Sequence, residues 1–265
     1  MNETIPLLRH ALSSPSAFTP EALVSAVRTE RKLLTTNVPQ VCVLDFDGDL
    51  TDLLLAKNFA VPHPSWACFH TAMSTIEVND AHCGIIARTI GGPYAVLIAE
   101  QLFVSGARVV LGLTSAGRVL ESLPIPSLVL AESAIRDEGT SYHYLPPSEA
   151  VTAPSNINEY LAAELRDVGL PLHCGLVWTT DAPYRETPEQ LKQHAHQGVL
   201  AVEMQAASLF TFAHARNAAV GIVAHVTNAI DHDGEDFDKG SDDFGLTLVR
   251  AVCRAGFRFL ASDLS

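Results

Sequence analysis

The chain has 265 residues, of which 48% are hydrophobic and 18% are charged, an ordinary composition for a compact soluble enzyme. Its 17 basic and 30 acidic residues give a net charge of −13, which argues against nucleic acid or an anionic membrane as a partner. No apolar run reaches the roughly 18 to 20 residues of a membrane span, and the first residues lack the pattern of a secretory signal.

The chain begins with two segments of helical pattern, 5–12 and 20–34, and Thr19 followed by Pro20 is a start signal for the second. We expect residues 1–38 to form an N-terminal helical extension. Apolar runs then predict strands at 41–44, 84–89, 108–113, 127–131, 172–178, 199–202 and 220–225. Amphipathic patterns between them predict helices at 94–105, 158–168, 188–196, 204–217 and 243–260.

This alternation of buried strands and amphipathic helices is typical of a sheet with helices on both faces. We therefore predict an α/β fold, a single domain over residues 1–265 with a mixed, largely parallel central sheet flanked by helices. Five cysteines, an odd number without CxxC spacing, favour a reduced, cytoplasmic setting.

Polar or glycine-rich residues follow several of the predicted strands. Ligands of such sheets bind at the carboxyl ends of strands, and backbone N–H groups there suit an anion. The segments concerned are CVLDFDGDL (42–50), IGGPYAVLIAEQL (90–102), VVLGLTSAG (109–117), AIRDEGTSYHYLPP (134–147), WTTDAPYRET (178–187), VEMQAA (202–207) and VAHVTNAI (223–230).

The order of these segments resembles the nucleoside phosphorylase-I family, which includes uridine phosphorylase and hexameric-type purine nucleoside phosphorylase. The resemblance rests on GGP before a helix, a strand ending in TSAG, IRDEGTSYHY, TTDAPYRET, and VEMQAA where the family has E-M-E. It implies phosphorolysis of a nucleoside, uridine phosphorylase-like, which gives a free base and a pentose 1-phosphate. Inorganic phosphate would be the co-substrate, with no cofactor or metal, in a homo-oligomer that is a dimer or a hexamer.

The resemblance assigns the sugar to Glu203, Met204 and Gln205. In the family, the second glutamate of E-M-E binds the 2′ and 3′ hydroxyls, and Gln205 stands at that position as a catalytic candidate. An amide offers one acceptor and two donors, so it can bind a diol, although without the strength that a charge adds. Met204 is expected to pack on the sugar.

The phosphate site matches the family less well. The family has a G-D-P-x-R turn after its first strand, and here Asp52 stands at the arginine position. A second arginine of the family corresponds to Gly112. Bidentate guanidinium contacts are a natural way to hold phosphate, so other groups must replace them. The remaining candidates for phosphate binding are Gly48, Thr114, Ser115 and Arg88.

For the base, Asn228 stands where the purine branch often has an aspartate that protonates the leaving group. An amide cannot supply that proton, but it donates and accepts at once, which suits an oxo-substituted base. The other base-binding candidates are Arg136, Arg185 and Thr180. Asn228 is also a catalytic candidate.

Several alternatives stay open. Without two arginines, the nucleophile could be water, as in a nucleoside hydrolase, or the pocket could bind a nucleoside without reaction. The run VCVLDFDGDLTD also resembles haloacid-dehalogenase-type phosphatases, with Asp45 and Asp47 in the acidic motif and GSDDFG (240–245) as a later one.

Two histidines and an acidic loop are weaker candidates. His225 is interpreted as a core residue, and His10 as a candidate for a neighbour's 5′ hydroxyl. The acidic loop 231–236 is interpreted as solvated rather than as a calcium site.

Overall fold

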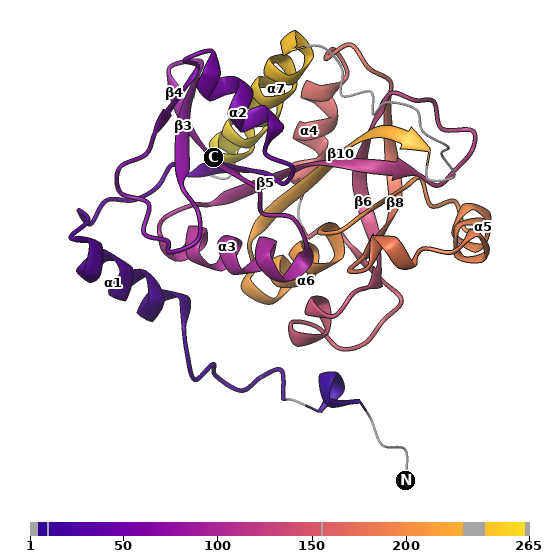
Figure 1. The fold of residues 1–265 in the computed structure, drawn as a ribbon, viewed down its shortest axis with the longest axis horizontal. Coiled ribbons are helices and arrows are strands. Elements are labelled where there is room, and N and C mark those ends of the chain that lie inside the picture. Colours follow the sequence, from indigo (N-terminus) through magenta and orange to yellow (C-terminus); the bar gives the residue numbers. More distant parts are fainter. Residues whose placement is uncertain (1–4, 10, 155, 230–241, 263–265) are drawn as a thin grey trace.

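The computed structural model of the chain describes residues 5–9, 11–154, 156–229 and 242–262. They form one α/β domain in which helices cover both faces of a central sheet (Figure 1). The predicted fold class, a single domain with a mixed sheet flanked by helices, is confirmed. None of the described helices combines the length and the apolar character that crossing a membrane requires.

The described elements alternate along most of the chain. The strands are β1 (Val41–Asp45), β2 (Ala60–Pro62), β3 (Met73–Val78), β4 (Ala81–Ala87), β5 (Val109–Arg118), β6 (Ser127–Asp137), β7 (Ala150–Thr152), β8 (Leu172–Thr180), β9 (Ala201–Glu203) and β10 (Ala219–Ala229). The α-helices are α1 (Pro20–Arg31), α2 (Asp49–Ala56), α3 (Gly92–Val104), α4 (Ile157–Leu165), α5 (Pro188–His196), α6 (Ala206–Arg216) and α7 (Asp242–Ser262). Three 3₁₀ turns are η1 (Pro6–Leu8), η2 (Thr140–His143) and η3 (Pro183–Arg185).

The sheet runs in the order β10-β6-β8-β9-β5-β1-β4-β3-β2, and β7 pairs with β6. Because β10 also pairs with β5, the strands β10, β6, β8, β9 and β5 close into a ring, from which the others extend. Of the pairings between described strands, five are parallel and five antiparallel. The short strands β2, β3 and β7, which the sequence did not predict, account for three of the antiparallel pairings and make the sheet less parallel than expected.

β1 shows why the sheet needs helices on both faces. Val41 and Val43 belong to a buried cluster with residues of α4 and α7, whereas Cys42 and Leu44 belong to a cluster with residues of α3 and α6. Alternate side chains of a strand point to opposite faces, so an uninterrupted apolar strand must be covered twice. Figure 1 shows α4 and α7 on one side of the sheet and α3 and α6 on the other.

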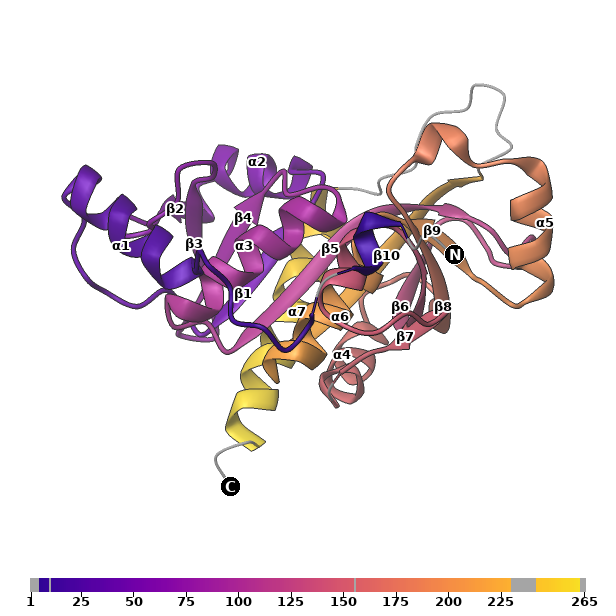
Figure 2. The ribbon, with the colours of Figure 1, turned by 90° about the horizontal axis from the view of Figure 1, so that it is seen from below.

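The N-terminal extension differs in part from the prediction. The predicted helix at 5–12 is wrong: only the turn η1 over Pro6–Leu8 forms, and none of its residues is buried. Only Leu7 of this turn is even partly buried, which is too little to offset the nucleation cost of a helix. The second helix is confirmed as α1, capped by Thr19 and anchored by the buried Val24 and Val27. Figure 2 shows α1 and α5 at opposite ends of the domain.

Three strands are longer than the apolar runs that predicted them. β5 continues to Arg118, β6 to Asp137 and β10 to Ala229, because strand pairing holds the polar residues that follow each apolar run. These continuations carry the polar segments singled out in the sequence. The site candidates on β5 and β10 are therefore placed by the sheet itself.

Gly112 is the point of closest packing in β5. A Cβ atom built on it would lie 2.5 Å from Cδ1 of Ile222 and 2.7 Å from Cε2 of Phe46. Both neighbours are buried, on β10 and directly after β1. The glycine at this position is therefore required by packing, and an arginine side chain does not fit there.

We expect Gly112→Ala to lower the free energy of unfolding by about 1–3 kcal/mol, since the added methyl group overpacks the core. Urea denaturation followed by circular dichroism measures this change. The matched control is Gly139→Ala, whose Cβ would meet its nearest neighbour, Oδ2 of Asp181, at an ordinary 3.6 Å. Equal stability of the two variants would contradict the packing argument.

Candidate active site

A cavity of about 220 Å³ lies where β5, β9 and β10 end and α6 begins. Strand pairing fixes its floor, because Gly117 is paired with Val202 on one side and with Asn228 on the other. Further wall residues come from the loops after β1, β4 and β8. The wall is formed by residues 114–117 and 202–205, together with Asp47, Ile90, Pro183, Glu186 and Asn228.

Glu203, the last residue of β9, is a buried carboxylate that fixes the start of α6. It accepts hydrogen bonds from the backbone N–H groups of Gln205 at 2.6 Å and Ala206 at 2.8 Å, and from the hydroxyl of Thr179. Burial raises the pKa of Glu203 to about 7, although these three bonds favour its charged form. Both carboxylate oxygens are thus engaged before any ligand binds.

Gln205 is the N-cap residue of α6 and is only 1% exposed. Its Oε1 atom accepts the backbone N–H of Met204 at 3.2 Å. Its buried Nε2 atom has no hydrogen-bond partner among the described residues. Leaving a buried donor unpaired costs about 1–3 kcal/mol, so this amide is ready to donate to a ligand in the cavity. The half-buried Met204 lies beside it in the wall.

The turn after β1 is held by the carboxylate of Asp45. Its Oδ1 atom accepts the backbone N–H of Gly48 at 3.1 Å, and its Oδ2 atom accepts the N–H and the hydroxyl of Thr51, each at 2.7 Å. Burial raises the pKa of Asp45, against these hydrogen bonds. Gly48 is absent from the cavity wall, and its N–H group is already used. This arrangement also ties up the aspartate that the phosphatase alternative needs as an open nucleophile.

Asp47 reaches the end of β5 and occupies a donor that was predicted to bind phosphate. Its Oδ2 atom accepts the backbone N–H of Ser115 at 2.7 Å. The hydroxyl of Thr114 donates to the carbonyl oxygen of Ser115 at 2.8 Å. Thr114 and Ser115 lie in the cavity wall as expected, with an anionic group of the protein already bound between β1 and β5.

The remaining phosphate candidate, Arg88, lies outside the cavity wall. It forms an ion pair with Asp52, and the two side chains are 60% and 55% exposed. Asp52 is the residue that stands at an arginine position of the family. The charges of Arg88 and Asp52 therefore compensate each other, and the guanidinium of Arg88 is directed to Asp52 on the surface.

A second cavity of about 370 Å³ adjoins the first and shares Asp47, Thr114 and Ser115 with it. Side chains of α2 and α7 form much of its wall, which is largely apolar. His225 lies in this wall and packs on the ring of Phe244, with the ring centroids 5.1 Å apart. This stacking fits the interpretation of His225 as a packing residue.

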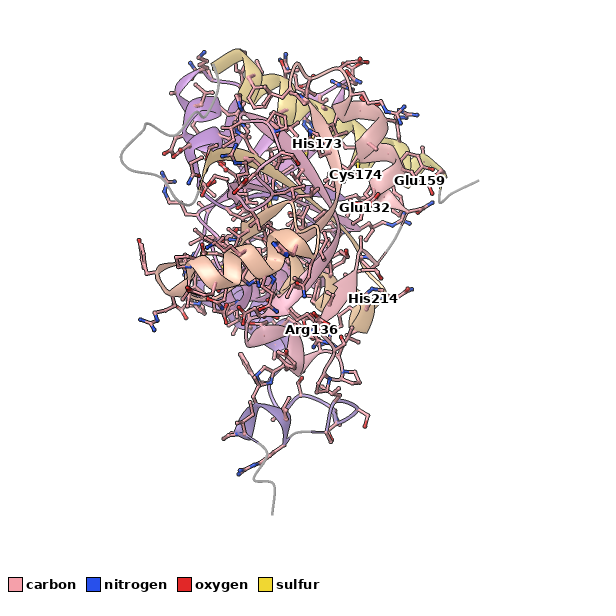
Figure 3. The ribbon with its side chains drawn as sticks, turned by 90° about the vertical axis from the view of Figure 1, so that its right-hand side faces the viewer. Glu132, Arg136, Glu159, His173, Cys174 and His214 are labelled. Carbon is pink, nitrogen blue, oxygen red and sulfur yellow. The ribbon has the colours of Figure 1, made fainter. Side chains whose placement is uncertain are left out.

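Arg136, a base-binding candidate, is absent from the cavity wall. Its guanidinium donates to the hydroxyls of Ser141 and Ser148 and to the carbonyl oxygens of Leu145 and Pro146, over 2.7 to 3.2 Å. Arg136 is 4% exposed and lies near the end of β6, where Figure 3 labels it. These four hydrogen bonds hold the loop that follows the strand.

Two further base candidates are also absent from the cavity wall. Thr180 is 5% exposed, and its hydroxyl accepts the backbone N–H of Ala182 at 3.2 Å, so it shapes the turn after β8. Arg185 is exposed at the end of η3. Its neighbours Pro183 and Glu186, rather than Arg185 itself, line the cavity.

Asn228 lies in the wall as predicted, and its Oδ1 atom accepts the hydroxyl of Thr227 at 3.2 Å.

Glu186 is the wall residue that sequence reasoning missed. It is half-buried, and burial raises its pKa to about 7. Its position inside TTDAPYRET was the available signal, but a glutamate beside an arginine is usually one half of a surface ion pair.

Some candidates lie outside the described residues. They are His10, the acidic loop 231–236 and the first residues of GSDDFG. Within the described ranges, no group of three or more histidine, cysteine, aspartate or glutamate side chains is placed to hold a metal ion.

Residues 40–259 match the family described as the phosphorylase superfamily. The chain belongs to this superfamily. The match contains all the described strands and the whole cavity wall, and it leaves the predicted extension at 1–38 outside. Because the residues of the VCVLDFDGDLTD run lie within this match, we drop the interpretation of the chain as a haloacid-dehalogenase-type phosphatase.

Named relatives in this superfamily are nucleoside phosphorylases. A guanosine phosphorylase of Halorubrum lacusprofundi is 28% identical over 147 residues, which cover 54% of this chain and 59% of the relative. A uridine phosphorylase of Thermococcus kodakarensis is 28% identical over 167 residues, 55% of this chain and 59% of the relative. A uridine phosphorylase of Treponema pallidum is 25% identical over 180 residues, 64% and 70%. The chain thus spans about 59% of the length of the first two.

We expect Gln205→Ala to weaken nucleoside binding about tenfold, because one hydrogen bond to a sugar hydroxyl is lost. Gln205→Glu replaces this donor by a charged acceptor of the sugar hydroxyls, so it should keep most of the binding that Gln205→Ala loses. Calorimetric titration with uridine and guanosine measures both effects. Gln193→Ala, at an exposed position on α5, is the control. If neither change at Gln205 alters binding or turnover, Gln205 does not contact the sugar.

Proposed function

We propose that this chain cleaves the N-glycosidic bond of a nucleoside with an oxo-substituted base, and transfers the pentose to inorganic phosphate. The products are a free base and a pentose 1-phosphate. The observation that carries the proposal is the unpaired, buried Nε2 atom of Gln205 in a cavity that also contains Met204 and Asn228. Guanosine and uridine phosphorylases among the relatives act on bases with carbonyl groups, which the amide of Asn228 suits.

The wall offers a separate surface for each part of a nucleoside. Gln205 donates to the sugar hydroxyls, and Met204 packs against the ring. Gly117, Val202 and Asn228 form one row across three strands, where the base stacks. Ser115 lies two residues before Gly117 on β5, about 7 Å away along the strand. In this proposal the nucleophile attacks the sugar from the Ser115 end of the wall.

Cleavage gives the sugar oxocarbenium character, so the site must stabilise positive charge at the anomeric carbon. Asp47 lies at the Ser115 end of the wall, next to the predicted position of the nucleophile. Phosphate binds at this end when it replaces the carboxylate of Asp47 as the acceptor of the Ser115 N–H group. Because phosphate and the carboxylate of Asp47 compete for the N–H group of Ser115, we expect phosphate to bind weakly.

The decisive test is incubation of the full chain with uridine, guanosine, inosine and thymidine, with and without inorganic phosphate. Free base is followed by chromatography. We expect base release that depends on phosphate and is accompanied by an equal amount of pentose 1-phosphate. Release of base without phosphate would establish hydrolysis instead, and binding without release would establish a non-catalytic nucleoside-binding protein.

Hydrolysis is the second candidate, and one contact favours it. Asp47 is an anion in the position where phosphate would bind, close to where the nucleophile stands. In this alternative the oxygen of a water molecule bonds to the anomeric carbon, and Asp47 takes a proton from that water. The bond to the base breaks, and the base leaves with its electron pair.

Asp47→Asn separates the two candidates. In a phosphorylase, the change removes a competing charge, and we expect the KM for phosphate to fall about tenfold while base release continues. In a hydrolase, it removes the general base, and base release falls about 100-fold at every phosphate concentration. Asp80→Asn, an exposed aspartate in the turn between β3 and β4, is the control.

We also propose that the chain acts in the cytoplasm as a homo-oligomer. Five free thiols, four of them buried, suit a reducing compartment. Tyr184 is 99% exposed and Ile90 is 52% exposed, close to the cavity or in its wall, and aromatic and apolar side chains of this kind are favoured in subunit contacts.

A further inference from the structure

Glu186 is a half-buried residue of the cavity wall whose carboxyl group has no hydrogen-bond partner among the described residues. It follows η3 and directly precedes Thr187, the N-cap residue of α5. A capping box fixes this segment: Gln190 N–H donates to the hydroxyl of Thr187 at 3.2 Å, and Thr187 N–H donates to Oε1 of Gln190 at 3.1 Å. The backbone at Glu186 is therefore held in place, and its side chain lies in the cavity wall.

The surroundings of Glu186 differ from those of Glu203. The side chain of Glu203 accepts three hydrogen bonds from the protein, whereas the side chain of Glu186 has none to another described residue. Burial alone raises the pKa of Glu186 to about 7. The other titratable groups of the wall are Asp47 and Glu203, and the exposed Arg185 and Glu189 flank Glu186 along the chain. With its pKa raised in this way, the carboxyl of Glu186 keeps a proton at a higher pH than an exposed glutamate does.

Cleavage of a nucleoside needs such a group. When the bond from the sugar to the base breaks, the base takes both electrons and must be neutralised by a proton. Asn228 cannot release one at neutral pH, and Arg136 is tied to the loop after β6. The carboxyl of Glu203 holds the start of α6. Among the described wall residues, Glu186 remains as the carboxylic acid with a proton to give.

We propose that Glu186 is the general acid of the proposed reaction, a catalytic residue that protonates the leaving base. The inference rests on the proposed function. As the nucleophile bonds to the anomeric carbon, the bond to the base breaks with its electrons on the base. The proton of the Glu186 carboxyl moves to a nitrogen or carbonyl oxygen of the base, which leaves Glu186 as a carboxylate. Solvent restores the proton after the base departs.

The test compares Glu186→Gln with Glu189→Gln, the same change at an exposed position three residues further along the chain. Two substrates are used: the best natural nucleoside, and p-nitrophenyl β-D-ribofuranoside, whose leaving group is a stable anion that needs no proton. We expect Glu186→Gln to lower kcat for the nucleoside about 100-fold or more, and to change kcat for the nitrophenyl riboside less than threefold. Glu189→Gln should leave both unchanged.

The pH profile provides a second readout. For the native chain, kcat/KM for the nucleoside should fall as the pH rises above about 7, because Glu186 loses its proton. This limb should disappear in Glu186→Gln and return in part in Glu186→Asp. If the limb persists in Glu186→Gln, it belongs to another group, such as Glu203, and the inference is overturned.

The outcomes separate the inference from the proposed function. If Glu186→Gln slows the cleavage of both substrates equally, or of neither, Glu186 is not the general acid. Cleavage of the nucleoside by the native chain would still support the proposed function in that case. A native chain that cleaves no nucleoside and no nitrophenyl riboside refutes both. Circular dichroism and urea denaturation of each variant show that a loss of activity does not come from unfolding.

Discussion

The carboxylate of Glu203 is the contact on which the rest of the site depends. It joins three elements at once, because its oxygens bind the hydroxyl of Thr179 on β8 and the first N–H groups of α6, while its backbone ends β9. A buried charge is stable only when its oxygens are hydrogen-bonded, so the three elements cannot separate without exposing it. Met204 and Gln205 follow directly, and their place in the cavity is set by this contact.

A second constraint is the distribution of negative charge after β1. Asp45 accepts the N–H of Gly48 inside the turn, and Asp47 accepts the N–H of Ser115 on β5. Asp52 forms an ion pair with Arg88 on the surface. Each aspartate occupies a donor that would otherwise be open to an anionic ligand. If the chain uses phosphate, as proposed, that anion competes with these carboxylates for the same donors.

The sequence predicted those features that repeat along the chain or that lie in a short motif. Apolar runs located β1 and the inner parts of β5, β6, β8 and β10, since burial on both faces leaves no choice of residue. The helix at 5–12 was wrong because its described residues bury too little apolar surface to stabilise a helix. The strands β2, β3 and β7 were missed because β2 and β7 are only three residues long and β3 has polar residues between its apolar ones, so none of them forms an apolar run.

The same division holds for the site. The sequence by itself determined that Gln205 stands at the start of a helix directly after a strand, because the apolar run that ends in VEMQAA predicts that junction. Only the tertiary structure decided that Arg136 serves its own loop, that Asp47 binds Ser115, and that Glu186 faces the cavity without a partner. Whether a charged side chain is used by the protein or left for a ligand depends on which distant groups surround it, and that information is not contained in local sequence.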